Sequence, residues 1–211
     1  MKAIIFDMDG VLVDSQPLHF KAEQKTFQHF GHKITKRELQ KYLGWSEDYF
    51  WTEMIKVYNL PASLEEIKAV KKPIFEDLLS SSLKSDLKLR TILLTLKDEF
   101  KLAVASSAPK SWIMMTLDGL EIADVFDAIV SAEEVKRSKP FPDVFLEAAK
   151  RLGTPPAECA VVEDAPAGID AANAAGMYSI ALKTPINKKL NLSKAKKEID
   201  SLDRILSLKI Q

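Results

Sequence analysis

Polar side chains that could do chemistry follow several short apolar runs of this 211-residue chain. They are the carboxylates of Asp7, Asp9, Glu163 and Asp164, the hydroxyls of Ser106 and Ser107, and the ammonium of Lys139. If the carboxylates came together, their repulsion would raise the pKa of some of them unless a cation compensated the charge. Mg²⁺, a hard cation that takes oxygen ligands, would provide that compensation, and Lys139 adds a second positive charge. The set therefore predicts a site for phosphate oxygens, at which a carboxylate can act as nucleophile and form an acyl-phosphate.

The apolar runs themselves predict the strands of a parallel α/β sheet. They are residues 3–6, 102–105, 128–130, 160–162 and 179–182. Parallel strands are buried on both faces and read as continuous apolar runs, and the stretches between these runs have helical patterns. Because ligands bind outside the carboxyl ends of the strands in an open parallel sheet, we expect the polar side chains to share one crevice.

Proline and glycine mark the ends of the helices that we expect between the strands. Pro109 suits a first helical position, and Pro142 begins a helix that Gly153 ends. A further helix is expected at about 167–175, where Gly176 follows it.

Residues 16–81 interrupt this alternation with helical periodicity and no convincing strand. Serine- and proline-containing segments stand at both edges of the stretch, at 15–17 and 80–82. We therefore expect an α/β core made of residues 1–15 and 82–211. A small all-helical domain, residues 16–81, would be inserted directly after the first strand.

The amino-acid composition and the net charge indicate which kind of protein this is and which partners are excluded. Hydrophobic residues make up 46% and charged residues 28%, as in a globular protein. Thirty basic residues balance thirty acidic ones, which argues against nucleic acid as a partner. The lysines at 194–197 are interpreted as the solvated face of a helix. Cys159 is the only cysteine, which excludes an internal disulfide and a cysteine-based zinc site.

No targeting or nucleotide-loop pattern is found in the sequence. No run approaches the roughly 18 apolar residues that span a bilayer, and the apolar stretch at the N-terminus ends too soon for a signal peptide. Neither of the glycine-rich patterns that cradle nucleotide phosphates occurs. We expect a cytoplasmic monomer with no membrane partner.

Four segments together resemble the motifs of the haloacid dehalogenase (HAD) superfamily. Residues 7–15, DMDGVLVDS, resemble its first motif, Ser106 matches the second, Lys139 the third, and Glu163 with Asp164 the fourth, in the family's order. The segments SKPFPD (138–143) and EDAPAGI (163–169) are similar to the subgroup that contains phosphoglycolate phosphatase and β-phosphoglucomutase. The resemblance covers essentially the whole chain, and it implies a doubly wound, Rossmann-like core with a small helical cap inserted after the first motif.

The resemblance also implies roles for individual residues. Asp7 would accept the phosphoryl group and ligate Mg²⁺. Asp9 would protonate the leaving alkoxide, deprotonate the attacking water, and touch the metal through its backbone carbonyl. Ser106 and Lys139 would hold the phosphoryl group, with Ser107 beside them. Asp164 would ligate the metal, and Glu163 would either do the same or orient a ligand.

Two cap residues bear on substrate recognition in the same subgroup. His19 is placed among the substrate-binding residues, although an exposed helix histidine is an equal alternative. Residues 44–47, Gly-Trp-Ser-Glu, occupy the position of the family's specificity loop in the cap. Glu47 stands where β-phosphoglucomutase would carry an arginine for the distal phosphate. An acidic residue there would repel a second phosphate and argues against the mutase.

We therefore interpret the chain as a Mg²⁺-dependent phosphatase that hydrolyses a small phosphomonoester, such as a sugar phosphate, through an aspartyl-phosphate at Asp7. The first alternative is a β-phosphoglucomutase-like sugar phosphate mutase, which would share every core residue. The second is a non-catalytic, phospho-accepting signalling module of the response-regulator type. Its acceptor lies on a middle strand and it has no helical insertion after the first strand, and neither feature matches this sequence. Ser106 has a structural alternative as a helix cap before Pro109.

Overall fold

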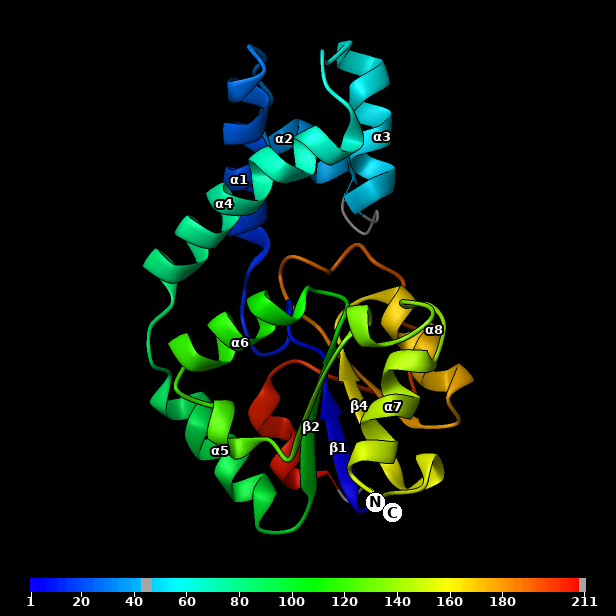
Figure 1. Cartoon of the computed structure of the whole chain (residues 1–211). Helices are drawn as coiled ribbons and strands as arrows, with labels where there is room; N and C mark the ends of the chain where they lie inside the picture. The colour runs from blue at the N-terminus through cyan, green and yellow to red at the C-terminus, as the bar shows by residue number, and fades with distance from the viewer. Residues whose placement is uncertain (43–46, 209–211) are drawn as a thin grey trace. The chain divides into compact units, whose positions relative to one another are not determined.

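A computed structural model describes residues 1–42 and 47–208, and within them a six-stranded parallel sheet forms the α/β part (Figure 1). The strands are β1 (Ala3–Phe6), β2 (Lys101–Ser106), β3 (Ala128–Ser131), β4 (Cys159–Glu163), β5 (Tyr178–Leu182) and β6 (Lys197–Ile199). Their order across the sheet is β3-β2-β1-β4-β5-β6. The direction of winding reverses between β1 and β4, so the predicted doubly wound sheet and its first five strands are confirmed.

Helices cover both faces of this sheet because alternate residues of each strand point to opposite sides. Ile4 and Phe6 of β1 pack in one apolar cluster with residues of α5 (Leu87–Lys97) and α6 (Lys110–Gly119). Ala3 and Ile5 pack in a second cluster with residues of α7 (Asp143–Arg151) and α8 (Pro166–Ala174). All four β1 residues are fully buried, which explains the continuous apolar run in the sequence.

Strand β6 is missing from the sequence prediction, and the interpretation of residues 194–197 as a helix face is wrong. Lys194 lies in a turn and Lys197 is the first residue of β6, which pairs with β5 in parallel. Lys197 and Glu198 are exposed, and Ile199 is buried. A three-residue edge strand with two charged residues has too little apolar pattern to be distinguished from a solvated segment.

The predicted helix ends differ from the observed ones by about a residue. Pro109 precedes α6, which begins at Lys110, so proline is not the first helical residue there. Gly153 follows α7 with φ of +59°, as expected of a glycine that ends a helix. Helix α8 begins at Pro166 and ends at Ala174, so each of its ends lies one residue earlier than in the expected range of 167–175.

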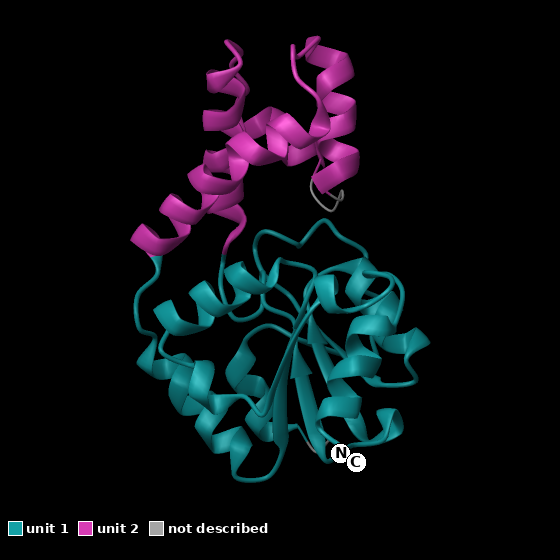
Figure 2. Ribbon diagram, in the orientation of Figure 1, with its two compact units in different colours: residues 1–14, 83–211 teal, residues 15–82 magenta. Residues whose placement is uncertain are grey.

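The chain divides into two compact units, Met1–Asp14 with Leu83–Gln211, and Ser15–Ser82 (Figure 2). We call the second the helical unit. Its helices are α1 (Gln16–His29), α2 (Lys36–Leu39), α3 (Glu47–Tyr58) and α4 (Leu64–Ser82). Phe27, Trp51, Met54 and Ile67 are fully buried in its own apolar core. None of the helices in the described part of the chain is both long and apolar enough to cross a membrane.

Candidate active site

The carboxyl ends of the three central strands bring the predicted residues together. Asp7 directly follows β1, and its backbone N–H donates to the carbonyl of Val162 in β4 at 2.9 Å. Ser106 is the last residue of β2 and Glu163 the last of β4. Since β1 lies between β2 and β4, these side chains converge beside the point where the winding reverses, the usual ligand position in such a sheet.

Lys139 reaches this point from the loop before α7. Its Nζ donates to Asp7 Oδ1 at 2.5 Å, to Glu163 Oε1 at 2.8 Å and to the carbonyl of Ala105 at 3.1 Å. Burial by itself lowers the pKa of the ammonium, but the two adjacent carboxylates outweigh burial and raise that pKa above its ordinary value. Lys139 is therefore a fixed positive charge between two acidic residues.

Three carboxylates of the described residues form an acidic cluster. Asp7, Glu163 and Asp164 each present an oxygen, and these oxygens lie within 4.8 Å of one another. Burial raises the pKa of Asp7 to about 7, with Glu163 and Asp9 adding to the rise and Lys139 opposing it. Burial, followed by the charges of Glu163 and Asp7, raises the pKa of Asp164 to about 8. One ammonium does not neutralise this cluster, and its hard oxygen donors suit a divalent cation.

Glu163 is held by more contacts than the other members of the cluster. Its Oε2 accepts hydrogen bonds from the backbone N–H groups of Asp164 and Ala165 at 2.8 and 2.9 Å, while Oε1 accepts from Lys139. The carboxylate packs on Gly168 of α8, where a Cβ would lie only 1.7 Å from Oε1. These contacts fix Glu163 as the group that orients Lys139 and the start of the loop after β4.

Asp9 and Gly10 lie in the turn that follows Asp7. Asp9 is half-buried, and its charge contributes to the raised pKa of both Asp7 and Asp164. Gly10 has φ of +80° and donates its N–H to the carbonyl of Val13 at 2.7 Å. A Cβ at Gly10 would lie 2.1 Å from Asp164 Oδ2, so this position needs glycine both for its backbone and for the space that Asp164 occupies.

The two serines after β2 have different surroundings. Ser106 is buried, and its Oγ accepts the backbone N–H of Ala108 at 3.0 Å. It does not cap α6, since Pro109 is the residue at that position. Ser107 is exposed, and its Oγ lies 3.1 Å from Ser138 Oγ, next to Lys139. Ser106 ends β2 and Ser107 follows it, and this strand pairs with β1, which precedes Asp7.

His19 belongs to the helical unit rather than to the α/β unit. It lies on α1, and its ring stacks on Phe75 with 4.3 Å between the ring centroids. Burial, assisted by the charge of Lys71, lowers the pKa of His19 to about 3, so the imidazole is neutral at pH 7.

Glu47 forms an ion pair within the same unit. It stands in the first turn of α3, and its Oε1 lies 2.5 Å from Nζ of the buried Lys71 on α4. The carboxylate is therefore compensated, and its expected repulsion of a second phosphate is weaker than the residue type suggests. Residues 44–46 of the expected specificity loop lie outside the described residues.

Three of the contacts described above could not be predicted from the sequence. Gly168 lies in the segment 163–169 that carries the resemblance, but the sequence does not show that this glycine packs against Glu163. Ser138 begins the segment 138–143 that carries the same resemblance, but nothing in the sequence indicates its contact with Ser107. Lys71 is one of thirty basic residues, and nothing in its local sequence marks it as buried.

Comparison with known proteins identifies the family of the chain. Residues 4–182 match the family model described as haloacid dehalogenase-like hydrolase. The phosphorylated carbohydrates phosphatase of Thermotoga maritima is 33% identical over 85% of this chain and 84% of its own length. The β-phosphoglucomutase of Bacillus subtilis is 34% identical over 86% of this chain and 83% of its own length.

Two further matches concern length and fold. The chloroplastic protein SUPPRESSOR OF QUENCHING 1 of Arabidopsis thaliana is 37% identical, and the chain spans 18% of its length. The solved structure of β-phosphoglucomutase from Clostridium difficile superposes with a TM-score of 0.77 at 30% identity, covering 97% of this chain and 93% of that one. These matches agree with the sheet and the helical unit described above. The chain therefore belongs to the haloacid dehalogenase-like hydrolases.

Proposed function

We propose that this protein is a phosphatase that hydrolyses a small phosphorylated carbohydrate or a similar phosphomonoester, with Asp7 as the nucleophile. The observation that carries the proposal is the buried Lys139 ammonium, held between Asp7 and Glu163 at the carboxyl ends of β1 and β4. A cation beside a carboxylate nucleophile attracts the phosphoryl oxygens and places the phosphorus near the attacking oxygen. The names of the relatives, a phosphatase and a mutase of phosphorylated sugars, support the same class of substrate.

Mg²⁺ is the cofactor that the donor set fits. It would be held by side-chain oxygens of Asp7 and Asp164 and by the backbone carbonyl of Asp9. Glu163 would orient the site through its hydrogen bonds to Lys139 and to the loop after β4. When bound, Mg²⁺ supplies compensation for the negative charge of the phosphoryl oxygens. Mg²⁺ prefers carboxylate oxygens, and it usually keeps water and phosphate oxygens among its ligands. A cluster that offers few protein ligands therefore suits it.

The chain's own residues account for each step of the reaction. An oxygen of Asp7 attacks phosphorus and forms a P–O bond, while the bond from phosphorus to the leaving alkoxide breaks and the alkoxide takes a proton from Asp9. A water then attacks the phosphorus of the aspartyl-phosphate, gives its proton to Asp9, and releases phosphate and free Asp7. Lys139, Ser106 and Ser107 hold the phosphoryl oxygens in both steps.

The ionisation state of Asp7 follows from the same contacts. The ionised carboxylate is the form that can attack, and burial opposes it by raising the pKa to about 7. That value already includes the lowering of the pKa by Lys139, and a bound divalent cation would lower it further. The cations of the site therefore serve the nucleophile as well as the substrate.

The helical unit would act as the cap that determines which phosphomonoester is accepted. It contains a group of titratable residues, namely His19, Glu23, Glu47 and Lys71. Such groups suit the hydroxyls of a sugar better than a second phosphate, because the charge of Lys71 is already compensated by Glu47.

A sugar phosphate mutase is the second candidate, favoured by the 34% identity to a β-phosphoglucomutase. It would use the same Asp7 chemistry but return the phosphoryl group to a sugar hydroxyl instead of water. The two candidates therefore differ in the acceptor of the phosphoryl group, not in the residues around Asp7.

The test is phosphate release from a panel of phosphorylated metabolites, first with Mg²⁺ and then with EDTA. The panel includes β-glucose 1-phosphate, with glucose 6-phosphate followed in the same wells. We expect Mg²⁺-dependent release of phosphate from some members and none from the Asp7→Asn variant. Glucose 6-phosphate formed without free phosphate would establish the mutase instead.

A further inference from the structure

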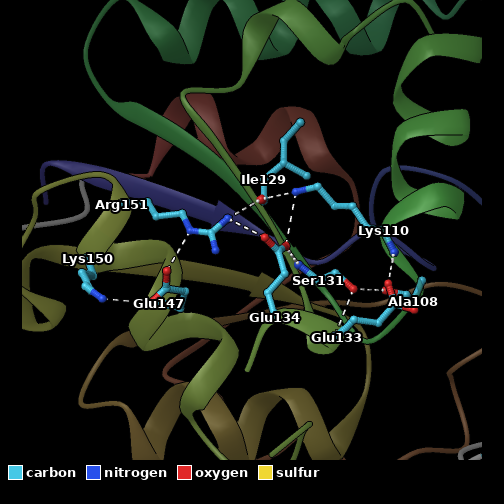
Figure 3. Close-up of polar contacts among 9 residues, drawn as sticks. All are labelled: Ala108, Lys110, Ile129, Ser131, Glu133, Glu134, Glu147, Lys150 and Arg151. Atoms are coloured by element: carbon cyan, nitrogen blue, oxygen red, sulfur yellow. Dashed lines mark hydrogen bonds and ion pairs between the residues drawn. The ribbon is translucent and has the colours of Figure 1, made fainter. Parts of the chain in front are cut away.

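Residues 106–109, which we call the 106–109 loop, carry both serines of the candidate site: Ser106 ends β2, and residues 107–109 before α6 have no regular structure of their own. The shape of this loop therefore depends on contacts from neighbouring segments. Strand β3 pairs with β2, and Ser131 is the register partner of Ser106. The 3₁₀ turn that follows β3, Ala132–Glu134, lies next to this loop (Figure 3).

Ser131 ties the end of β3 to the loop. Its side chain is fully buried, and its Oγ donates to the carbonyl of Ala108 at 2.7 Å (Figure 3). The same oxygen accepts the backbone N–H of Glu133 at 3.2 Å. The hydroxyl therefore donates one hydrogen bond to the loop and accepts one from the turn.

Glu133 makes the second tie, at the other end of the loop. Its Oε2 accepts the backbone N–H of Lys110, the first residue of α6, at 2.8 Å. Pro109, which precedes that helix, provides no side-chain cap, so Glu133 supplies a cap from another segment. A carboxylate is favourable at this position because the start of a helix carries a partial positive charge.

The turn that carries these two residues is itself anchored. Glu134 accepts the backbone N–H of Ser131 at 2.8 Å and also binds Lys110 Nζ and Arg151, at 3.3 and 3.0 Å. Lys110 and Arg151 both donate to the carbonyl of Ile129 in β3, at 2.6 and 3.0 Å (Figure 3). The contacts therefore form one network from β3 through the turn to α6.

We propose that Ser131 and Glu133 are positioning residues that fix the 106–109 loop, so that Ser106 and Ser107 meet the phosphoryl group in the geometry that transfer requires. The inference rests on the proposed phosphatase activity and adds to it two residues that touch neither substrate nor metal. Preorganised donors lower the barrier only when they are held at the place where charge develops. A shift of the loop therefore lowers the rate of transfer more than the binding of the sugar.

The first experiment replaces Ser131 by alanine and uses Ser179→Ala as a matched control. Ser179 is also a fully buried strand serine, whose Oγ donates once, at 2.8 Å to Asn173, and accepts one backbone N–H, from Lys196 at 3.2 Å. Both variants lose an equivalent pair of hydrogen bonds, and we expect similar decreases in melting temperature. Only Ser131→Ala should lower kcat, by about tenfold, with KM changed less than about twofold. Ser131→Thr, which keeps the hydroxyl, should restore kcat.

The second experiment uses Glu133, an exposed residue whose replacement leaves the core intact. Glu133→Ala removes the acceptor for the Lys110 N–H, whereas Glu133→Gln keeps an acceptor oxygen. We expect Glu133→Ala to lower kcat severalfold and to weaken competitive inhibition by inorganic phosphate, with Glu133→Gln close to the unsubstituted protein.

The outcomes separate this inference from the proposed function. The positioning roles are wrong if Ser131→Ala has the same kcat as Ser179→Ala, or if Glu133→Ala and Glu133→Gln have the same kcat and the same inhibition by phosphate. The proposed phosphatase activity would not be affected by either result. If the unsubstituted protein releases no phosphate from any substrate, the proposed function fails and the positioning roles fail with it.

Discussion

Lys139 is the residue on which the electrostatics of the site depend. Its ammonium contacts Asp7 and Glu163 at 2.5 and 2.8 Å, and no other ammonium or guanidinium is described in contact with either of them within residues 1–42 and 47–208. Without it, the pKa of Asp7 would rise further, since Lys139 is the charge that lowers it. The proposed nucleophile would then be ionised to a smaller extent at neutral pH.

Replacement of Lys139 by methionine is expected to lower kcat/KM by about 10²-fold or more, because a fixed charge on the phosphoryl oxygens is lost. The activity that remains should increase with pH over a higher range than in the unsubstituted protein. Lys183→Met is the control, because it breaks an exposed ion pair with Glu198 and should change stability by less than about 1 kcal/mol. Steady-state kinetics from pH 5 to 9 measure both effects, and a Lys139→Met protein with the same kcat/KM and pH profile would contradict the role of this residue.

Gly168 provides a second test at the same scale. Alanine favours a helix over glycine by up to about 1 kcal/mol, so Gly168→Ala should stabilise α8 if only helix propensity mattered. The added Cβ would lie 1.7 Å from Glu163 Oε1, and we therefore expect a less stable protein with lower activity. Ala167→Gly, at the exposed neighbouring position, changes propensity in the opposite direction without touching Glu163. Denaturation and phosphate release on both variants decide the matter, and a more stable, fully active Gly168→Ala protein would be the contrary result.

At the scale of elements, helices α1, α3 and α4 are joined by a charged group in the helical unit. Glu47 on α3 binds the buried Lys71 on α4 at 2.5 Å, and the charges of both residues act on Glu23 of α1. Burial raises the pKa of Glu23 from 4.5 to about 7, Lys71 opposes this, and Glu47 adds to it. Folding therefore favours the protonated form of Glu23.

A pH dependence of stability follows from this shift. Between about pH 4.5 and 7 the folded protein holds a proton on Glu23 that the unfolded chain has lost, so rising pH lowers the free energy of unfolding across this range. The Glu23→Gln variant lacks this contribution. We expect its stability relative to the unsubstituted protein to be greater at pH 8 than at pH 5. Urea denaturation at the two pH values measures the difference, and an equal difference at both would show that Glu23 titrates normally.

The elements also show which parts of the fold the sequence can predict. Strands β1 to β5 are buried on both faces, so their apolar runs identify them without knowledge of the fold. Strand β6 escapes because Lys197 and Glu198 are exposed and only Ile199 is buried. Its pairing with Ile180–Leu182 of β5 arises between distant segments, which local pattern does not report.

At the scale of the whole molecule, the order of the strands assembles a site from segments far apart in the sequence. Asp7, Ser106 and Glu163 could be predicted because each stands at the end of a recognisable strand. The contacts of Ser131 and Glu133 with the 106–109 loop could not, because they depend on side-chain directions across neighbouring segments. Polar residues at strand ends are thus predictable, whereas the residues that hold them in place require the structure.

If the acidic cluster binds Mg²⁺ as proposed, metal binding stabilises the folded protein. If Mg²⁺ binds the folded protein alone, a concentration of 100 times its Kd should stabilise the protein by about 2.7 kcal/mol. We expect the melting temperature to rise with Mg²⁺ and to return to its starting value with EDTA. Asp164→Asn should abolish the increase, and an equal increase in that variant would place the metal elsewhere.

The central claim is that Asp7 carries the phosphoryl group, and trapping the intermediate tests it most directly. A substrate found by the panel, labelled with ³²P in its phosphoryl group, is mixed with the protein and Mg²⁺ and quenched in acid within milliseconds. We expect label on the peptide that contains Asp7 and none on the Asp7→Asn variant. Label on another peptide, or turnover with no labelled protein at any time, would contradict it.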